Sequence, residues 1–137
     1  MKWFAILTMI ILISTGCNND QNGIPYFPIN ITIYTDDPQW IGLAATGGFE
    51  YVSGGSKGLI VFRISPDEFM AYERHTPYQP DQDCRVTVDS TGIVAEDMDC
   101  SGSRFNLFNG SVIEGPATLP LHAYRTTFIN GVLTINN

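Results

Sequence analysis

The fold class is decided by the segment Cys100–Asn137, which reads CSGSRFNLFNGSVIEGPATLPLHAYRTTFINGVLTINN. It holds two Asn-Gly pairs, Asn109-Gly110 and Asn130-Gly131, each beside runs of β-branched and aromatic residues. Asn-Gly is the strongest short signal for a hairpin, because a type I′ turn needs positive φ at both central residues. The segment therefore predicts two antiparallel hairpins. The strands predicted beside the two turns are Arg104–Phe108, Tyr124–Ile129 and Val132–Ile135.

The chain before this segment shows the same strand-like pattern. A third hairpin is predicted where Asp89-Ser90-Thr91-Gly92 separates Arg85–Val88 from Ile93–Glu96. Further strands are predicted at Ile29–Tyr34, Phe49–Val52, Gly58–Ile64 and Phe69–Arg74. Trp40–Leu43 fits either a short helical turn or an edge segment, and no segment keeps a helical period beyond a turn or two. Together these features predict an all-β protein, an antiparallel β sandwich or barrel.

The composition excludes several classes of protein. The chain has 137 residues, of which 14 are acidic and 7 are basic, so its formal charge is −7. This length suits one compact domain. A nucleic-acid-binding protein needs a clustered basic face to displace counterions, and seven scattered basic residues do not provide one. With 44% hydrophobic and 15% charged residues, the chain is not disordered.

The N-terminus predicts an export signal. Lys2 precedes an apolar run from Trp3 to Ile13, whose 11 residues are fewer than the roughly 20 that a membrane-spanning helix needs. Ser14-Thr15-Gly16-Cys17 resembles a bacterial lipobox, in which the Cys is lipidated and becomes the new N-terminus, although Ser14 stands where Leu is usual. We therefore expect residues 1–16 to be a lipoprotein signal peptide and Cys17 to be the lipidation site. The alternative is an ordinary cleaved signal with a chance Cys.

The residues after Cys17 are predicted to form a tether. Residues 17–27 start with a run of Asn, Asp, Gln and Gly, which is typical of a flexible linker, and residues 28–137 are predicted to be the β domain. Lipid acyl chains on Cys17 would anchor the protein to a membrane. The sequence thus predicts a periplasmic or outer-membrane lipoprotein in the cell envelope of a Gram-negative bacterium. Asp20 does not follow Cys17 directly, which favours the outer membrane weakly.

The stretch from Gly58 to Asn137 resembles a Rieske domain, the small β fold that carries a 2Fe–2S cluster in cytochrome bc complexes and ring-hydroxylating oxygenase ferredoxins. The resemblance rests on Cys100–Leu107, on Gly110, and on the Gly-Pro-Ala and Pro-Leu steps within Gly115–Leu121. Upstream, Tyr72–Tyr78 is similar to the strand and loop that hold the first ligand pair. The resemblance implies a Rieske-like antiparallel β sandwich or barrel.

The same resemblance implies that the cluster ligands are missing. A Rieske cluster takes two thiolates on one iron and two imidazoles on the other. The matching positions here are Thr76, Tyr78, Met98 and Ser101, none of which supplies a thiolate or an imidazole. We therefore expect no cofactor and no bound metal. The alternative is a 2Fe–2S cluster or another metal held by atypical ligands.

Many cytochrome bc-type Rieske domains join their two cluster loops by a disulfide, and the resemblance implies one here between Cys84 and Cys100. Cys100 falls on the middle Cys of the second loop, and Cys84 lies somewhat further beyond the first loop than is usual. An oxidising compartment outside the cytoplasm agrees with this pairing. Two unrelated buried thiols, or a metal site built from His75, Cys84 and Cys100, are the alternatives.

The function expected from these features is that of a non-catalytic binding or structural module. Its partner is expected to be an envelope protein that docks on residues 76–82 and 97–103, where Tyr78 is predicted to be exposed. An electron-transfer protein with an atypical cluster is the second hypothesis. A hydrolase is the third, since Ser101 and Ser103 with His75 and Asp97 or Asp99 form one conceivable catalytic set. No catalytic residue is expected, because no Gly-x-Ser-x-Gly motif surrounds either serine.

Overall fold

The computed structural model describes residues 23–137, which form ten β-strands and two short 3-10 helices. The predicted signal peptide, Cys17 and most of the predicted tether lie outside the described residues. At the start of the described part, Ile24 is buried, with 1% of its surface exposed. Within residues 23–137, no helix has the length and apolar character needed to cross a membrane.

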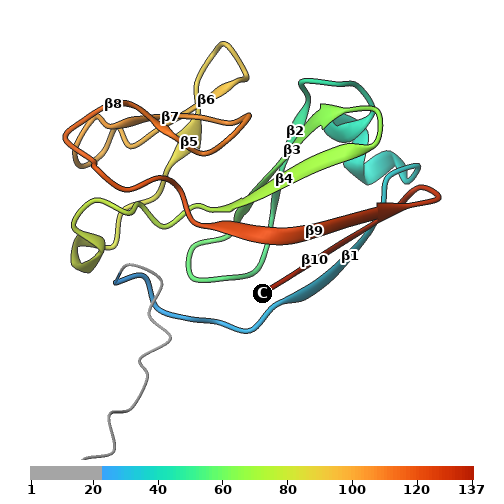
Figure 1. Cartoon of the computed structure of the whole chain (residues 1–137), viewed down its shortest axis with the longest axis horizontal. Helices are drawn as coiled ribbons and strands as arrows, with labels where there is room; N and C mark the ends of the chain where they lie inside the picture. Colours follow the sequence, from blue (N-terminus) through green and yellow to red (C-terminus); the bar gives the residue numbers. More distant parts are fainter. Residues whose placement is uncertain (1–22) are drawn as a thin grey trace, which may run out of the picture.

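The larger of two antiparallel sheets has six strands, and its strand order places the first strand beside the last one (Figure 1). In spatial order the strands are β1 (Asn30–Tyr34), β10 (Val132–Asn136), β9 (Ala123–Ile129), β4 (Glu68–Glu73), β3 (Leu59–Ser65) and β2 (Phe49–Val52). The C-terminal hairpin thus lies in the middle of the sheet, between β1 and β4. This arrangement confirms the predicted all-β class.

The smaller sheet lies at one end of the larger one (Figure 1). Its strands, in order, are β5 (Thr87–Val88), β6 (Val94–Glu96), β7 (Arg104–Asn106) and β8 (Val112–Glu114). The sheet is inserted in sequence between β4 and β9, which are neighbours in the larger sheet. It is therefore carried on two paired strands of the larger sheet.

The two Asn-Gly turns differ. At the β9–β10 turn, Asn130 has φ of 49° and Gly131 has φ of 79°, as a type I′ turn requires, so this prediction is confirmed. The β7–β8 turn is wider, and the prediction of a two-residue turn at Asn109-Gly110 is wrong. Strand β7 ends at Asn106, whose side-chain oxygen accepts the Phe108 N–H at 2.8 Å, and the chain turns locally before Gly110.

The segment that the sequence left undecided is helical. Residues Pro38–Leu43 form the 3-10 helix η1, and the Asp37 carboxylate caps it by accepting the Gln39 N–H at 3.1 Å. The helix buries Leu43 against the larger sheet. The short helical turn is thus the correct alternative for Trp40–Leu43.

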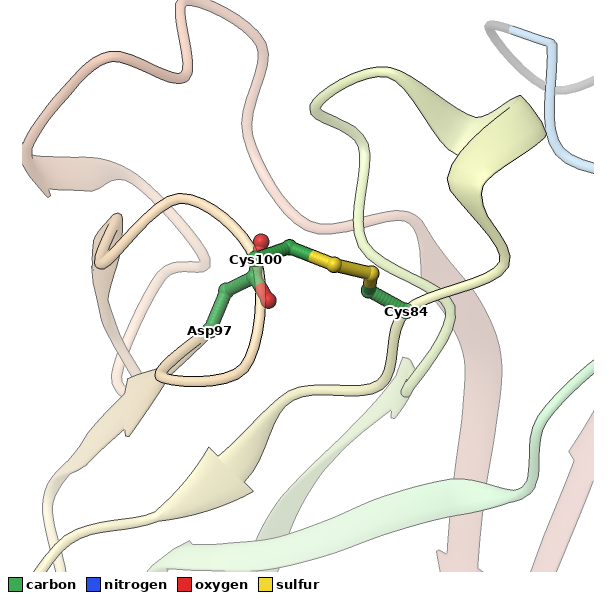
Figure 2. A group of neighbouring side chains, drawn as sticks. All are labelled: Cys84, Asp97 and Cys100. Carbon is green, nitrogen blue, oxygen red and sulfur yellow. A yellow bond between two sulfur atoms is a disulfide. The ribbon is translucent and has the colours of Figure 1, made fainter.

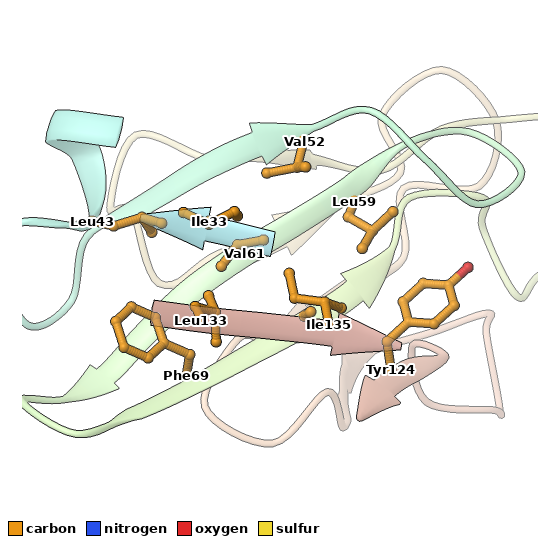
Figure 3. Packing of buried hydrophobic residues seen from close by; sticks show 10 residues of the cluster. Ile33, Leu43, Val52, Leu59, Val61, Phe69, Tyr124, Leu133 and Ile135 are labelled. Atoms are coloured by element: carbon orange, nitrogen blue, oxygen red, sulfur yellow. The ribbon is translucent and has the colours of Figure 1, made fainter. Parts of the chain in front are cut away.

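The hydrophobic core consists of two clusters that share strands β3 and β4. On β3, Leu59 and Val61 face one cluster while Ile60 and Phe62 face the other, and all four are fully buried. Alternate residues of a strand point to opposite faces, so a strand with an unbroken apolar run is covered on both sides. The first core cluster (Figure 3) comprises Ile33, Leu43, Val52, Leu59, Val61, Phe69, Ala71, Tyr124, Leu133 and Ile135. The second core cluster comprises Ile60, Phe62, Tyr72, Val86, Ala95, Phe105, Leu107, Ala117 and Leu121.

A buried carboxylate at the end of β4 joins three parts of the chain. Glu73 is fully buried, and its two carboxylate oxygens accept hydrogen bonds from the backbone N–H groups of Ser56, Lys57 and His75 at 2.7–2.9 Å. The Tyr124 hydroxyl on β9 donates a fourth bond, at 2.7 Å. Burial, with the bond to Glu73 as a smaller cause, raises the pKa of Tyr124, which keeps this hydroxyl protonated. Glu73 therefore fixes the β2–β3 connection and the start of the next loop to the sheet.

We predict that Glu73→Gln lowers the free energy of unfolding by about 2–3 kcal/mol, since an amide puts an N–H₂ group against buried donors and leaves them unpaired. Urea denaturation of the purified protein measures this change. Glu68→Gln, at the exposed start of the same strand, is the control and should change stability little. Equal losses for the two variants would contradict the role given to Glu73.

Candidate functional site

Two loops at the end of the molecule that carries the smaller sheet contain the residues predicted from the sequence. The first loop, residues 76–84, follows β4, and the Thr76 N–H bonds to the Cys84 carbonyl at 3.1 Å across its base. It contains the 3-10 helix η2 (Pro80–Gln82), which is flanked by Gln79 and Asp83, both with positive φ. The two ends of the first loop thus lie close together, joined by a backbone hydrogen bond.

The second loop, residues 97–103, connects β6 to β7 as a tight turn. The Asp97 N–H bonds to the Ser103 carbonyl at 2.9 Å, and the Gly102 N–H bonds to the Asp97 carbonyl at 2.7 Å. Gly102 has φ of 72°, a conformation that residues with a side chain rarely adopt, which explains the glycine at this point. The Ser103 side chain is buried, and its hydroxyl accepts the Ala117 N–H at 2.9 Å.

A disulfide between Cys84 and Cys100 joins the two loops, as the resemblance to Rieske domains implied (Figure 2). The two Cα atoms are 6.4 Å apart, and 16 residues separate the cysteines in sequence. Cys84 is partly buried and Cys100 is exposed, so the bond lies at the surface of the loop pair. The alternative of two unrelated thiols is therefore wrong.

Asp97 forms a second link between the loops. It is fully buried, and its Oδ2 atom accepts hydrogen bonds from the Thr76 hydroxyl at 3.0 Å and from the Ser101 hydroxyl at 2.9 Å. Its Oδ1 atom is also buried and has no hydrogen-bond partner among residues 23–137. The carboxylate lies beside the disulfide, with one of its oxygens and both sulfur atoms within 4.8 Å of one another (Figure 2).

The four residues at the expected cluster-ligand positions have different environments. Thr76 is fully buried and Ser101 is partly buried, and both donate to Asp97. Met98 has 66% of its surface exposed. Tyr78 is partly buried against the second core cluster, so the prediction that it is exposed is wrong. Its ring covers part of the apolar core, which explains why a residue in a Pro-rich loop is not free in solvent.

His75 belongs neither to the alternative metal site with Cys84 and Cys100 nor to the alternative hydrolytic set with Ser101 or Ser103. It is 2% exposed, and its Nδ1 atom lies 2.8 Å from the Ser56 hydroxyl while its Nε2 atom lies 2.7 Å from the Pro80 carbonyl. A carbonyl only accepts, so Nε2 donates to it, while Nδ1 and the serine hydroxyl form the second bond. Both ring nitrogens are therefore engaged in holding the first loop. Neither bonds to Ser101 or Ser103, as a hydrolytic set would require, and the cysteines grouped with His75 are joined to each other.

Sequence reasoning missed the role of Asp97. The sequence places Asp97 only in the hydrolytic set, as an acid beside His75. Its bonds to Thr76 and Ser101 join residues 21 and 4 positions away in sequence. The available signal was an Asp at the start of a loop that contains Ser101 and Ser103, but only the fold shows which hydroxyls reach it.

We predict that loss of the disulfide lowers the free energy of unfolding by about 3 kcal/mol, the loop-closure value for a loop of this size. The Cys84→Ser single variant and the Cys84→Ser/Cys100→Ser double variant should lose nearly the same amount, because each removes the same bond. Urea denaturation of both variants, beside the wild type with and without dithiothreitol, measures it. A double variant that loses twice as much as the single variant would show two independent thiols instead.

Comparison with known proteins supports the fold. No protein-family model matches the chain, and no curated protein matches it significantly. Among solved structures, a chain from the "Complex of reduced oxygenase and oxidized ferredoxin in carbazole 1,9a-dioxygenase", a Rieske-type complex, is similar with a TM-score of 0.51 and 20% identity. The match covers 80% of this chain and 92% of that chain. The described chain has a Rieske-like fold, in which a disulfide joins the two loops.

Proposed function

We propose that this protein is a lipid-anchored cell-envelope protein whose Rieske-like domain has no iron–sulfur cluster and acts as a non-catalytic binding or structural module. Cys17 carries the lipid, and residues 17–27 connect it to the domain. The domain meets its partner, another envelope protein, through the two loops. Nucleic acid is not among its ligands, because the net charge is −7.

The observation that carries this proposal is the bond from Thr76 to Asp97. In the Rieske arrangement the residues at the positions of Thr76 and Ser101 ligate iron, whereas here both donate to one buried carboxylate. A hydroxyl that donates to a carboxylate is a poor ligand for a cluster that needs thiolates and imidazoles. The Asp97 bonds and the disulfide hold the two loops together, which is the structural task that a cluster performs in the family.

The surface of the two loops supports a docking role. Asp81 and Asp83 on the first loop are exposed, and so are Met98 and Asp99, which are neighbours on the second loop. The Lys57 ammonium, by donating to its side chain, lowers the pKa of Asp83, which stays ionised at neutral pH. An exposed thioether among carboxylates suits a partner with an apolar contact and a basic rim.

A second candidate function is electron transfer with an atypical metal site. The proximity of the Cys84 and Cys100 sulfur atoms to the Asp97 carboxylate favours it, since all three donors lie within 4.8 Å of one another. This function requires both sulfurs as thiolates, which the disulfide excludes. Its site would therefore exist only in a reduced protein.

We predict that protein purified from an iron-replete culture contains no stoichiometric iron and lacks the visible absorption of a Rieske cluster. Metal analysis and an absorption spectrum measure this, with a Rieske ferredoxin that has intact ligands prepared in parallel as the control. Thiol titration of denatured, unreduced protein should find neither Cys84 nor Cys100 free. Iron in a two-to-one ratio to protein, together with two free thiols, would overturn the main proposal in favour of electron transfer.

We predict that reversing charge on the first loop weakens partner capture. The variant Asp81→Lys/Asp83→Lys should recover several-fold less of a specific envelope protein in a cross-linking pull-down, because it repels the basic rim of the partner. Asp67→Lys/Glu68→Lys, at the β3–β4 turn, makes the same charge change away from the two loops and is the matched control. The same set of captured proteins for both variants and the wild type would count against docking at the loops.

A further inference from the structure

The molecule has a cleft beside the first loop that none of the functions above uses. Its volume is about 380 Å³, and it is lined by the connection between β2 and β3, residues 53–58, together with Tyr51, Arg74 and Arg85. A cleft of this size is in the range of small-molecule sites, of order 300–1,000 Å³.

The cleft concentrates positive charge in an acidic protein. Six of the seven Lys and Arg residues lie in the described part of the chain, and three of these six line the cleft: Lys57, Arg74 and Arg85. None of the described residues that line it is acidic. The whole chain has a formal charge of −7, so this concentration of cations in one concave site is opposite to the overall charge.

Arg74 is held rigidly with part of its guanidinium unused. Its Nε donates to the Val86 carbonyl at 3.1 Å, and its guanidinium carbon lies 3.9 Å from the centre of the Tyr51 ring. The Tyr51 hydroxyl is itself fixed, because it accepts the Val88 N–H at 2.9 Å. The two Nη groups of Arg74 make no hydrogen bond to any residue within 23–137. They are thus pre-positioned donors at the wall of the cleft.

Arg85 supplies a second, unpaired cation. Its side chain is exposed and makes no hydrogen bond or ion pair within the described residues, while its backbone is fixed by a β-bridge to His75. Arg74 and Arg85 line the same cleft, and burial and the charge of Arg85 lower the pKa of Arg74, while Tyr51 and Glu73 act in the opposite direction. An anion bound between the two guanidinium groups would offset their mutual repulsion and accept hydrogen bonds from both.

Two carboxylates, Glu73 and Asp83, act on this pair through their charge, but neither is hydrogen-bonded to it within the described residues. Glu73 lies below the cleft, but its oxygens already accept four hydrogen bonds. Asp83 forms an ion pair with Lys57. The Nη donors of Arg74 and the guanidinium donors of Arg85 therefore remain available to a ligand, although the two carboxylates offset part of the charge.

Two glycines allow the loop that lines the cleft to lie close to the rest of the domain. Gly55 has φ of 60°, and a Cβ at this residue would lie 2.2 Å from an oxygen of Glu73, so only glycine allows the loop to approach the carboxylate so closely. Gly54, with φ of 144°, is equally restricted to glycine. At both positions a Cβ would point into the domain, toward Glu73 and Tyr124 or toward Ile31 and Leu59, so the two glycines let this wall of the cleft pack closely on the sheet.

We propose that this cleft binds a small organic anion, and that Arg74 and Arg85 recognise its carboxylate or phosphate group. The site is built from fixed arginines and a glycine-rich loop, and it does not depend on whether the two loops hold a metal or a protein partner. The size of the cleft leaves room for the body of a ligand of about sugar size beside the exposed ring of Tyr51.

Titration of ¹⁵N-labelled protein tests the proposal, with glucuronate as the carboxylate probe, glucose 6-phosphate as the phosphate probe and glucose as the uncharged probe. The expected result is a saturable shift of the Gly54, Gly55 and Ser56 amide signals with at least one anionic probe and none with glucose. Which anion binds more tightly identifies the class of natural ligand. No saturable shift with either anion up to 20 mM would overturn the proposal.

The variant Arg85→Gln should weaken binding about tenfold, because it removes charge-assisted hydrogen bonds without removing any contact seen within the domain. Arg125→Gln is the matched control, since Arg125 is an exposed cation on β9 outside the cleft, and it should change the affinity less than twofold. Arg85→Lys keeps the charge but loses the paired donors of the guanidinium group, so its loss of affinity should lie between those of the two Gln variants. Equal losses for Arg85→Gln and Arg125→Gln would show attraction by net charge alone and overturn the assigned site.

Discussion

The buried carboxylate of Glu73 is the interaction on which both candidate surfaces depend. A fully buried charge is tolerated only where donors surround it, and Glu73 has four of them from three separate segments. Through Ser56 and Lys57 it sets the wall of the cationic cleft, and through His75 it fixes the start of the first loop. The ring of His75 is in turn hydrogen-bonded to the Ser56 hydroxyl and the Pro80 carbonyl. Glu73 therefore positions both the wall of the cleft and the first loop.

The two loops show how a Rieske-like scaffold is held together without the ligands of a cluster. The disulfide joins the loops at their surface, and the Thr76–Asp97 bond joins them in the interior. The two links differ in chemistry, since the first responds to reductant and the second does not. The Oδ1 atom of Asp97 is buried and has no hydrogen-bond partner in the described chain, so the interior link leaves one acceptor unsatisfied.

Local patterns predicted every described strand except β8 (Val112–Glu114), because alternation of apolar residues and turn chemistry act over a few residues. The β9–β10 hairpin is the clearest case, since Asn130-Gly131 specifies its turn. The disulfide was implied by resemblance to a family. The Glu73 and Asp97 networks and the cleft were not predicted, because they join residues far apart in sequence: 51 positions separate Glu73 from Tyr124. Which donors a buried carboxylate meets is a property of the tertiary fold.

The double burial of β3 has a consequence for strand alignment. In most sheets a slip by one residue would turn apolar side chains to water, and this cost specifies the alignment. Along Leu59–Phe62 both faces are apolar and fully buried, so a slip would exchange one apolar set for another. Polar anchors at the strand ends must then supply the discrimination: Glu73 at the end of β4, and Arg63 on β3, which donates to the Leu43 carbonyl at 2.7 Å. In this sheet, hydrogen bonds of polar side chains specify the strand register, because burial of apolar side chains would be similar in the shifted register.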